Sequence, residues 1–227
     1  MDRLLVLETL MKEKKLTNYL EIGVFNAHIF FRMPTSSKVA VDPEFQFDWL
    51  RKAGKTLLNP RNLFAKYLEK TSDDFFRDDA PGLFAKRKIN LALIDGMHEY
   101  HYALRDIENT LSYGASDVVI VVHDCNPQKR EDAISFQQWK DRRFSGTWNG
   151  DVWKAILHLR SLRHDLDVFV LDCDHGLGII TKRAPQIPLS YSEADILRFH
   201  FSDFEGHRNE WLNLKPARYF YEYFGLQ

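Results

Sequence analysis

The sequence predicts an α/β protein in which a mostly parallel sheet carries helices on both faces. Short apolar segments alternate along the chain with longer segments whose apolar residues recur at helical spacing. Several of the short segments are apolar throughout, which is typical of strands that are buried on both faces. The last two are joined by a short turn, which indicates an antiparallel pair. The expected fold is a three-layer sandwich with a seven-stranded sheet whose last strand is antiparallel.

Seven segments are expected to form the strands. Ile89–Asp95 is too short for a helix and begins and ends its apolar part with isoleucine, and Asp117–Asp124 is the most apolar stretch of the chain. The other five are, in chain order, Tyr19–Val24, Lys38–Asp42, Asn62–Leu68, Leu166–Leu171 and Gly178–Thr181.

Helices are expected between these strands. Leu4, Leu7 and Met11 have helical spacing and predict an amphipathic opening helix, and 100–111 has one apolar face. The remaining helical segments are Phe25–Arg32, Phe45–Leu58 (helical or irregular), Asp74–Phe84 and Gly150–Arg163, and the polar segment Arg130–Arg143 is expected to be a mobile connection or lid.

The amino-acid composition argues against some classes of binding partner. The chain has 31 basic and 32 acidic residues, so its net charge of −1 predicts no bulk attraction to nucleic acid or to an acidic membrane. It has no apolar segment of membrane-spanning length, and its N-terminus lacks the layout of a signal peptide. Its two cysteines make neither a disulfide framework nor a zinc pattern. We therefore expect a cytoplasmic protein without a nucleic-acid or membrane partner.

The chain is expected to contain one main domain and an extension. Residues 1–184 hold all the predicted strands, without a repeat or a Gly/Ser-rich linker. Residues 185–227 form an aromatic-rich extension. Because clustered aromatic residues usually pack in a core or an interface, the extension is expected either on the domain or at a homo-oligomer interface.

Four carboxylates lie at the ends of predicted strands: Glu21, Asp42, Asp95 and Asp124. Buried strand ends seldom carry acids without a partner, because desolvating a charge is costly, so four of them indicate a shared polar site. Asp42, at the end of the second strand, is positioned to bind ribose hydroxyls, and Gly23 allows the backbone to approach a ligand. The sequence after Gly23 lacks the G-x-G-x-x-G fingerprint, which favours a nucleoside without a pyrophosphate.

Five motifs together resemble the class I S-adenosylmethionine-dependent methyltransferases. The subgroup with an I-D-G-x-H-x-Y segment, similar in layout to metal-assisted small-molecule O-methyltransferases, is the one they resemble most, and the resemblance extends over residues 17–183. The motifs are Leu20-Glu-Ile-Gly-Val-Phe, Val39-Ala-Val-Asp-Pro, Thr71-Ser-Asp-Asp-Phe-Phe, Leu93-Ile-Asp-Gly-Met-His-Glu-Tyr and Val121-Val-His-Asp-Cys-Asn-Pro.

This resemblance implies a Rossmann-like fold, S-adenosylmethionine as cofactor and O-methylation of a small hydroxylated molecule such as a sugar or secondary metabolite. It also implies roles for six residues. These are Glu21 and Gly23 beside the methionine part, Asp42 on the ribose, Ser72 and Asp73 by the adenine, and Asp95 facing the methyl sulfonium.

Two catalytic routes follow from the same resemblance. His98 occupies the position of a general base, with Asp95 beside it. In the metal-assisted members, Asp95 and Asp124 would bind Mg²⁺ or another divalent cation, which lowers the pKa of a hydroxyl. Cys125 follows Asp124 where the family usually has Asp or Asn, so Asn126 becomes the third expected ligand.

Two other functions remain open at this point. One is a non-catalytic nucleoside-binding or scaffold protein, supported by Ala27 where the family usually has a second glycine in its first motif. The other is a metal-dependent hydrolase built on Asp95, His98, His123 and Asp124, although these residues lack the usual helical ligand spacing.

Several polar residues near the predicted site also have structural explanations. His98 could cap the next helix instead of acting as a base. His123 is expected on the opposite side of its strand from Asp124, because side chains alternate along a strand. Asp174 and His175 lie in a predicted turn and are expected to be solvated. Trp148 is expected either at a helix start or in the wall of an acceptor pocket.

Overall fold

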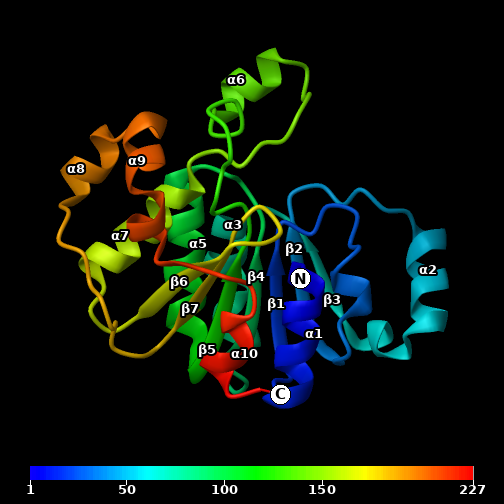
Figure 1. Ribbon diagram of the computed structural model, residues 1–227. Coiled ribbons are helices and arrows are strands. Elements are labelled where there is room, and N and C mark those ends of the chain that lie inside the picture. Colours follow the sequence, from blue (N-terminus) through cyan, green and yellow to red (C-terminus); the bar gives the residue numbers. More distant parts are fainter. Residues whose placement is uncertain (227) are drawn as a thin grey trace. The chain divides into compact units, whose positions relative to one another are not determined.

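A computed structural model describes residues 1–226, in which helices and strands alternate along the chain (Figure 1). The chain forms two compact units, and each is described by itself. The N-terminal unit contains Arg3–Gly96 and Asp106–Ile120. The C-terminal unit contains Met1–Asp2, Met97–Arg105 and the residues from Val121 onward.

The N-terminal unit holds four strands, four α-helices and two 3-10 helices, and it shares one further helix and one further strand with the C-terminal unit. Its own elements are α1 (Arg3–Glu13), β1 (Asn18–Ile22), η1 (Phe30–Arg32), β2 (Ser37–Asp42), α2 (Trp49–Leu58), η2 (Pro60–Phe64), β3 (Lys66–Glu69), α3 (Ser72–Asp78), α4 (Ala80–Leu83) and β4 (Ile89–Ile94). The shared elements are α5 (Tyr100–Tyr113) and β5 (Gly114–Val122).

The strands of the N-terminal unit follow the order β3-β2-β1-β4-β5. β1 pairs in parallel with both β2 and β4, so that Glu21 lies opposite Ala40 on one side and Leu93 on the other. β2 also pairs in parallel with β3. Since the carboxyl ends of parallel strands meet at one edge, Glu21, Asp42 and Asp95 come to the same edge of this unit, as the sequence predicts.

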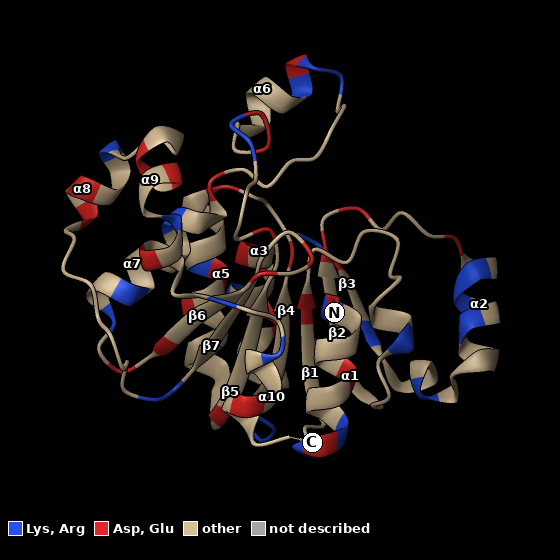
Figure 2. Ribbon diagram, in the orientation of Figure 1, with Lys and Arg blue, Asp and Glu red and all other residues tan. Residues whose placement is uncertain are grey.

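The opening helix α1 is amphipathic, as its spacing predicts. Leu4, Leu7, Leu10 and Met11 are buried on one face, and α1 contacts β4 and lies along the strands in Figure 1. Charged residues are distributed over many elements (Figure 2). α2 differs from the rest because all of its charged residues are basic and none of its residues is buried.

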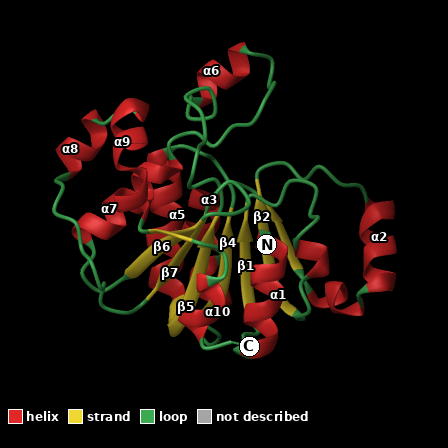
Figure 3. Ribbon diagram, in the orientation of Figure 1, coloured by secondary structure: helices red, strands yellow, loops and turns green. Residues whose placement is uncertain are grey.

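The C-terminal unit contains the end of β5 and all the later elements. These are α6 (Phe136–Asp141), α7 (Val152–Leu162), β6 (Asp167–Leu171), β7 (Leu177–Thr181), α8 (Glu193–Arg198), α9 (Phe201–Leu212), β8 (Leu214–Lys215) and α10 (Tyr219–Phe224). The strand order here is β5-β7-β6-β8. β6 and β7, which are neighbours in Figure 3, are antiparallel, and this confirms the interpretation of their short turn. β8 pairs in parallel with β6.

The strand count differs from the expected one. The structure describes eight strands instead of seven, because Leu214 and Lys215 pair with β6. A two-residue strand has no periodicity, so no pattern in the sequence marks it. The fold class, an α/β Rossmann-like protein with a mostly parallel sheet and an antiparallel strand, is confirmed.

The aromatic extension belongs to the C-terminal unit. Trp153 of α7 lies 4.7 Å, between ring centroids, from Phe204 of α9 and 5.8 Å from Trp211. Arg160 of α7 donates hydrogen bonds to the backbone oxygens of Trp211 and Ile187. The extension therefore packs on the helix that precedes β6, while the boundary at residue 184 and the homo-oligomer interface stay predictions.

Two predicted elements are shorter than expected. The segment Phe25–Arg32 holds only the 3-10 turn η1, because Phe25 and Ala27 have φ angles of 48° and 57°, which no α-helix accepts. The strand expected at Asn62–Leu68 begins only at Lys66, because Pro60 opens the 3-10 helix η2 there. The expected lid segment contains the short helix α6, capped by Ser135.

No helix within residues 1–226 has both the length and the apolar character needed to span a membrane.

Candidate functional site

The sequence-predicted site residues fall into two groups, one in each unit. Glu21, Gly23, Asp42, Ser72, Asp73 and Asp95 belong to the N-terminal unit, and His98, Asp124 and Asn126 belong to the C-terminal unit. Each group is described within its own unit.

Glu21 is a buried acid near the end of β1. Its Oε2 accepts a hydrogen bond of 2.5 Å from the Tyr19 hydroxyl, and 2% of the residue is exposed. Burial raises the pKa of Glu21 to about 8, since the Tyr19 hydrogen bond only partly offsets the desolvation and the nearby Asp95 charge adds to it. Glu21 therefore binds a proton readily and would lose it most easily beside a cationic group.

Lys38 is a buried cation on β2 whose charge influences Glu21, but its ammonium group forms hydrogen bonds with the backbone. Its Nζ donates to the carbonyl oxygens of Phe30 (2.8 Å) and Met33 (3.0 Å) at the end of η1. Burial lowers the pKa of Lys38 to about 8. The turn between β1 and β2 is thus held by a lysine, which the sequence did not single out.

Gly23 is required by the backbone itself. It has a φ of 80°, and a Cβ at this position would lie 2.0 Å from the carbonyl oxygen of Asp95. The Gly23 N–H bonds the Val41 oxygen, and the Asp95 N–H bonds the Ile22 oxygen. The close approach expected at Gly23 therefore joins the ends of β1 and β4, which fixes the edge where a ligand would bind.

Asp42 orders the two loops that follow β1 and β2. Its Oδ2 accepts from the Phe25 N–H (2.7 Å), and its Oδ1 accepts from the Glu44 N–H (2.8 Å). Each carboxylate oxygen has a second lone pair, so Asp42 retains acceptor capacity for a hydroxyl. Ser72 and Asp73 lie in the first turn of α3, which Thr71 caps, and Asp73 is exposed.

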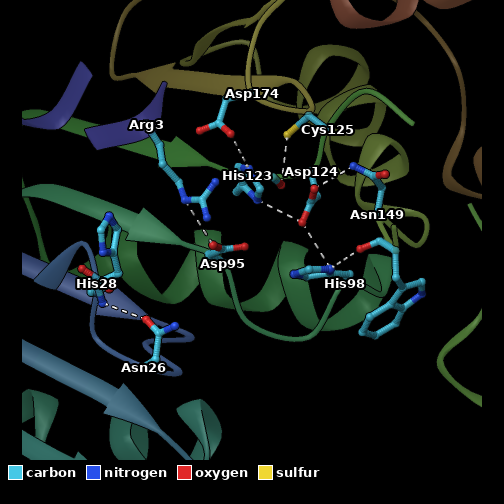
Figure 4. Close-up of polar contacts among 12 residues, drawn as sticks. Arg3, Asn26, His28, Asp95, His98, His123, Asp124, Cys125, Asn149 and Asp174 are labelled. Atoms are coloured by element: carbon cyan, nitrogen blue, oxygen red, sulfur yellow. Dashed lines mark hydrogen bonds and ion pairs between the residues drawn. The ribbon is translucent and has the colours of Figure 1, made fainter. Parts of the chain in front are cut away.

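Asp95 directly follows β4 and has a cationic neighbour from α1. The Nε of Arg3 lies 3.6 Å from the Asp95 Oδ2, with both side chains partly exposed (Figure 4). Sequence reasoning missed Arg3, because an arginine in the first turn of an amphipathic helix has no distinguishing pattern.

His98, in the C-terminal unit, is fixed through one ring nitrogen. Its Nδ1 lies 2.7 Å from the Trp148 carbonyl oxygen and 3.3 Å from the Asp124 Oδ2, and its ring contacts the Trp148 ring (Figure 4). Because a carbonyl oxygen only accepts hydrogen bonds, Nδ1 is assigned the proton. In the neutral ring, Nε2 then carries the lone pair that a base needs.

Gly150 supports the same histidine from the backbone. It has a φ of 58°, and a Cβ there would lie 1.6 Å from the His98 carbonyl oxygen. The next residue, Asp151, donates its N–H to that oxygen at 3.1 Å and accepts from the Tyr100 N–H at 2.6 Å. The start of α7 is thereby attached to the segment that carries His98.

Asp124 is surrounded by N–H groups. Its Oδ1 accepts from Asn149 Nδ2 at 2.7 Å, and its Oδ2 lies 3.0 Å from His123 Nδ1 and 3.3 Å from His98 Nδ1 (Figure 4). Only 5% of the residue is exposed. This geometry suits a carboxylate that orients a histidine and stabilises its charged form.

The expectation that His123 faces away from Asp124 fails. Alternation requires extended backbone, but Asp124 has a φ of 60°, which turns its side chain back toward the histidine. The other ring nitrogen of His123, Nε2, lies 3.5 Å from Asp174 Oδ1, so Asp174 is not simply a solvated turn residue. Asn149, Asp174 and the Trp148 carbonyl are site groups that sequence reasoning did not assign.

The expected metal ligand Asn126 faces a cationic side chain. Its Oδ1 accepts from the Arg208 guanidinium, which also donates to the Pro127 oxygen at 2.6 Å, and its Nδ2 donates to Asp172 at 3.2 Å. The oxygens of Asp124 and Asn126 are therefore engaged by N–H donors. The metal stays a prediction.

The donor set of the N-terminal unit, in contrast, fits a nucleoside. Asp42 offers free lone pairs at the end of β2, and the glycine turn at Gly23 keeps this edge clear of a side chain. Ala27 has the left-handed backbone that glycine adopts most easily, and its methyl group is fully buried. The substitution for the family's glycine is thus accommodated within the turn.

Comparisons with known proteins agree with this geometry. A family model described as a methyltransferase domain matches residues 20–125. No curated protein sequence matches the chain at a significant level.

Three solved structures have a similar fold. The O-methyltransferase TomG from Streptomyces achromogenes, in complex with SAM, has a TM-score of 0.57 and 14% identity, with 79% of this chain and 78% of that chain covered. An O-methyltransferase from Bacillus cereus, in complex with SAH, has a TM-score of 0.53 and 11% identity, with 78% and 79% covered. The SAH-bound methyltransferase PaMTH1 from Podospora anserina has a TM-score of 0.53 and 16% identity, with 78% and 76% covered. The matched region contains β1, β2, β4 and the residues that follow them, and the three solved structures share the Rossmann-like fold of this chain, so residues 20–125 are similar to a methyltransferase domain.

Proposed function

We propose that the protein is an S-adenosylmethionine-dependent O-methyltransferase of a small hydroxylated molecule, a sugar or a secondary metabolite, with His98 as general base. The observation that carries this proposal is the contact of His98 Nδ1 with the Trp148 carbonyl and Asp124. In the neutral imidazole this contact places the lone pair on Nε2, which can then accept a proton.

Cofactor binding is assigned to the N-terminal unit. Asp42 would accept hydrogen bonds from the ribose hydroxyls, and Ser72 and Asp73 would lie beside the adenine. Glu21 would meet the amino-acid part, where a cationic ammonium would favour its ionised form. S-adenosylmethionine, when bound, supplies an electrophilic methyl group on a sulfonium. The SAM and SAH in the structures of TomG and of the Bacillus cereus enzyme support this assignment.

Proton transfer is assigned to the C-terminal unit. The acceptor hydroxyl gives its proton to His98 Nε2, and its oxygen lone pair would bond to the methyl carbon. The bond between this carbon and sulfur would break, its electron pair would go to sulfur, and S-adenosylhomocysteine would leave. In the imidazolium that forms, Nδ1–H continues to donate its hydrogen bond to the Trp148 oxygen, and the ring lies beside the Asp124 carboxylate. Asn149 and His123 hold that carboxylate in place. Such general base catalysis contributes roughly 10²–10⁴-fold to a rate.

The metal-assisted route is the competing mechanism. Mg²⁺ or another divalent cation would need oxygens from Asp95, Asp124 and Asn126, and two of these residues already accept hydrogen bonds from Asn149 and Arg208. We therefore assign no step to a metal. Activity in the presence and absence of a chelator separates the two routes.

The first experiment is calorimetry with S-adenosylmethionine and S-adenosylhomocysteine. We expect both to bind to the wild-type protein and both to bind more weakly to Asp42→Asn, while Asp141→Asn, an exposed aspartate of α6, binds as the wild type does. Binding of neither compound would contradict the proposal. Binding without methylation of any acceptor in a panel of sugars and phenols would favour the non-catalytic alternative.

A further inference from the structure

An apolar surface on α2 and η2 lies outside the residues assigned to methyl transfer. Six large apolar side chains are exposed there, with Leu57 and Leu58 exposed by 84% and 81%; together they form what we call the α2–η2 surface: Trp49, Leu50, Leu57, Leu58, Leu63 and Phe64. The two helices contact each other, and Asn62 of η2 donates to the Lys55 oxygen of α2. Adjacent exposed apolar residues of this size mark an interaction site.

The orientation of α2 is the reverse of that expected for a surface helix. At 100° per residue, Trp49, Leu50, Ala53 and Leu57 share one side, and all four are exposed. Lys52, on the other side, is partly buried and lies over the Tyr67 ring at 3.9 Å from its centroid. A helix of a soluble protein usually buries its apolar side, so this helix presents that side to a partner.

The charge of this segment indicates an anionic partner. Between Trp49 and Lys66 there are five basic residues and no acidic one, although the whole chain has a net charge of −1: Arg51, Lys52, Lys55, Arg61 and Lys66. Figure 2 shows α2 with basic residues alone among its charged ones. A symmetric contact with a second copy would bring two such positive sets together, which is unfavourable.

We infer that the α2–η2 surface docks the protein on an anionic lipid membrane. Apolar side chains would enter the boundary between headgroups and acyl chains, and Arg51, Arg61 and Lys66 would lie against the lipid phosphates. The surface has four leucines beside two aromatic residues. A nucleic acid would use the aromatic rings and the charges but would leave the leucines without a function. With ten residues, α2 would lie in the interface and not cross it.

This proposal differs from the expectation of no membrane partner, which rested on the net charge of the chain and stays untested. A net charge is an average, and the positive segment is balanced by acidic residues elsewhere in the sequence. The inference does not depend on the methyltransferase activity, since vesicle binding is measured without cofactor or acceptor.

The test is cosedimentation of the full chain with vesicles. We expect binding to vesicles of phosphatidylglycerol and phosphatidylcholine, and at least about tenfold weaker binding to phosphatidylcholine alone or at high salt. Leu57→Ser with Leu58→Ser removes apolar contact, and Arg51→Gln with Arg61→Gln and Lys66→Gln removes charge. Each variant should bind the anionic vesicles at least about tenfold more weakly.

The matched control is Ile187→Ser with Leu197→Ser, two exposed apolar residues of the C-terminal unit, which should bind as the wild type does. Circular dichroism checks that every variant is folded. Wild-type protein that fails to sediment with anionic vesicles, or a Leu57/Leu58 variant that binds as the wild type does, would overturn the inference. Self-association that depends on Leu57 and Leu58, without vesicle binding, would assign the surface to a second copy instead.

Discussion

Glu21 and Asp124 are both buried acids at strand ends, but their surroundings differ. Glu21 has one hydrogen-bond donor, the Tyr19 hydroxyl, and its pKa is raised to about 8 by burial. Asp124 has Asn149, His123 and His98 within 3.3 Å of its oxygens. The donors around each carboxylate therefore suit it to a different function: Glu21 can pair with a cationic ligand, and Asp124 orients a histidine.

The largest effect is expected from removing the histidine that Asp124 holds. His98→Ala should lower kcat for methyl transfer by about 10²–10⁴-fold, because the acceptor hydroxyl loses its base, while the Kd for S-adenosylmethionine stays unchanged. Steady-state kinetics and calorimetry measure the two quantities. The matched control is His101→Ala, an exposed histidine of α5. An equal decrease of kcat in His98→Ala and His101→Ala would contradict the assignment of His98 as the general base.

The next effect concerns Asp124 itself. Asp124→Asn should lower kcat by about 10²-fold, since an amide cannot stabilise the imidazolium as a carboxylate does. Asp174→Asn, which removes the carboxylate 3.5 Å from His123 Nε2, should have a smaller effect. The measurement is kcat at saturating cofactor, with the thermal unfolding midpoint as a check on folding and Asp141→Asn as the exposed control. A variant Asp124→Asn with wild-type kcat would make this carboxylate merely structural.

Glu21 should influence stability in a pH-dependent way. Its pKa is about 8 in the folded protein against 4.5 for an ordinary glutamate, so the folded state binds the proton more tightly and the free energy of unfolding falls as pH rises from about 4.5 to about 8. Glutamine is neutral at every pH, so Glu21→Gln should not show this decrease in the free energy of unfolding, which is on the order of a few kcal/mol in the wild type.

Denaturant unfolding of wild type and variant at several pH values in that window measures this difference. Lys38, whose pKa is lowered to about 8, contributes with the opposite sign and only above pH 8, so it does not interfere. Glu13→Gln, at the end of α1, is the control. Parallel curves for Glu21→Gln and the wild type would show that burial of Glu21 has no energetic consequence.

The smallest effect is expected at Arg3. Its contact with Asp95 spans 3.6 Å between partly exposed side chains, and such pairs contribute less than about 1 kcal/mol. Arg3→Gln should therefore lower the free energy of unfolding only slightly, compared with no change for Lys12→Gln at an exposed site of the same helix. A loss of several kcal/mol would mean that Arg3 has a larger role than the contact with Asp95.

The sequence predicted the features of this protein that depend on local pattern. Apolar strands, their order in the chain and the acids at their ends follow from burial and from the energetic cost of charge, so Glu21, Asp42 and Asp95 were identified without a structure. Gly23 was also identified, as a position where the backbone approaches a ligand. In the structure a glycine is required there because the backbone of Asp95 occupies the space that a side chain would need.

What the sequence could not predict depends on left-handed backbone and on distant contacts. Positive φ angles at Phe25 and Ala27 prevent the helix that was expected there. The positive φ angle at Asp124 places its side chain on the same side as His123, where strand alternation predicted opposite sides. The base is oriented by the Trp148 carbonyl, a backbone group that every residue has, 50 positions away in the sequence. Arg208, which faces Asn126, lies 82 positions from it, in the extension that no motif covers.

The most direct test of the account is methyl transfer from labelled S-adenosylmethionine to an identified acceptor by wild type and His98→Ala, each with and without a chelator. The account predicts that wild-type activity persists after chelation and that His98→Ala loses at least about 10²-fold in both conditions. Activity that disappears with the chelator, or that survives in His98→Ala, would contradict a base held by Asp124 and favour a cation in its place.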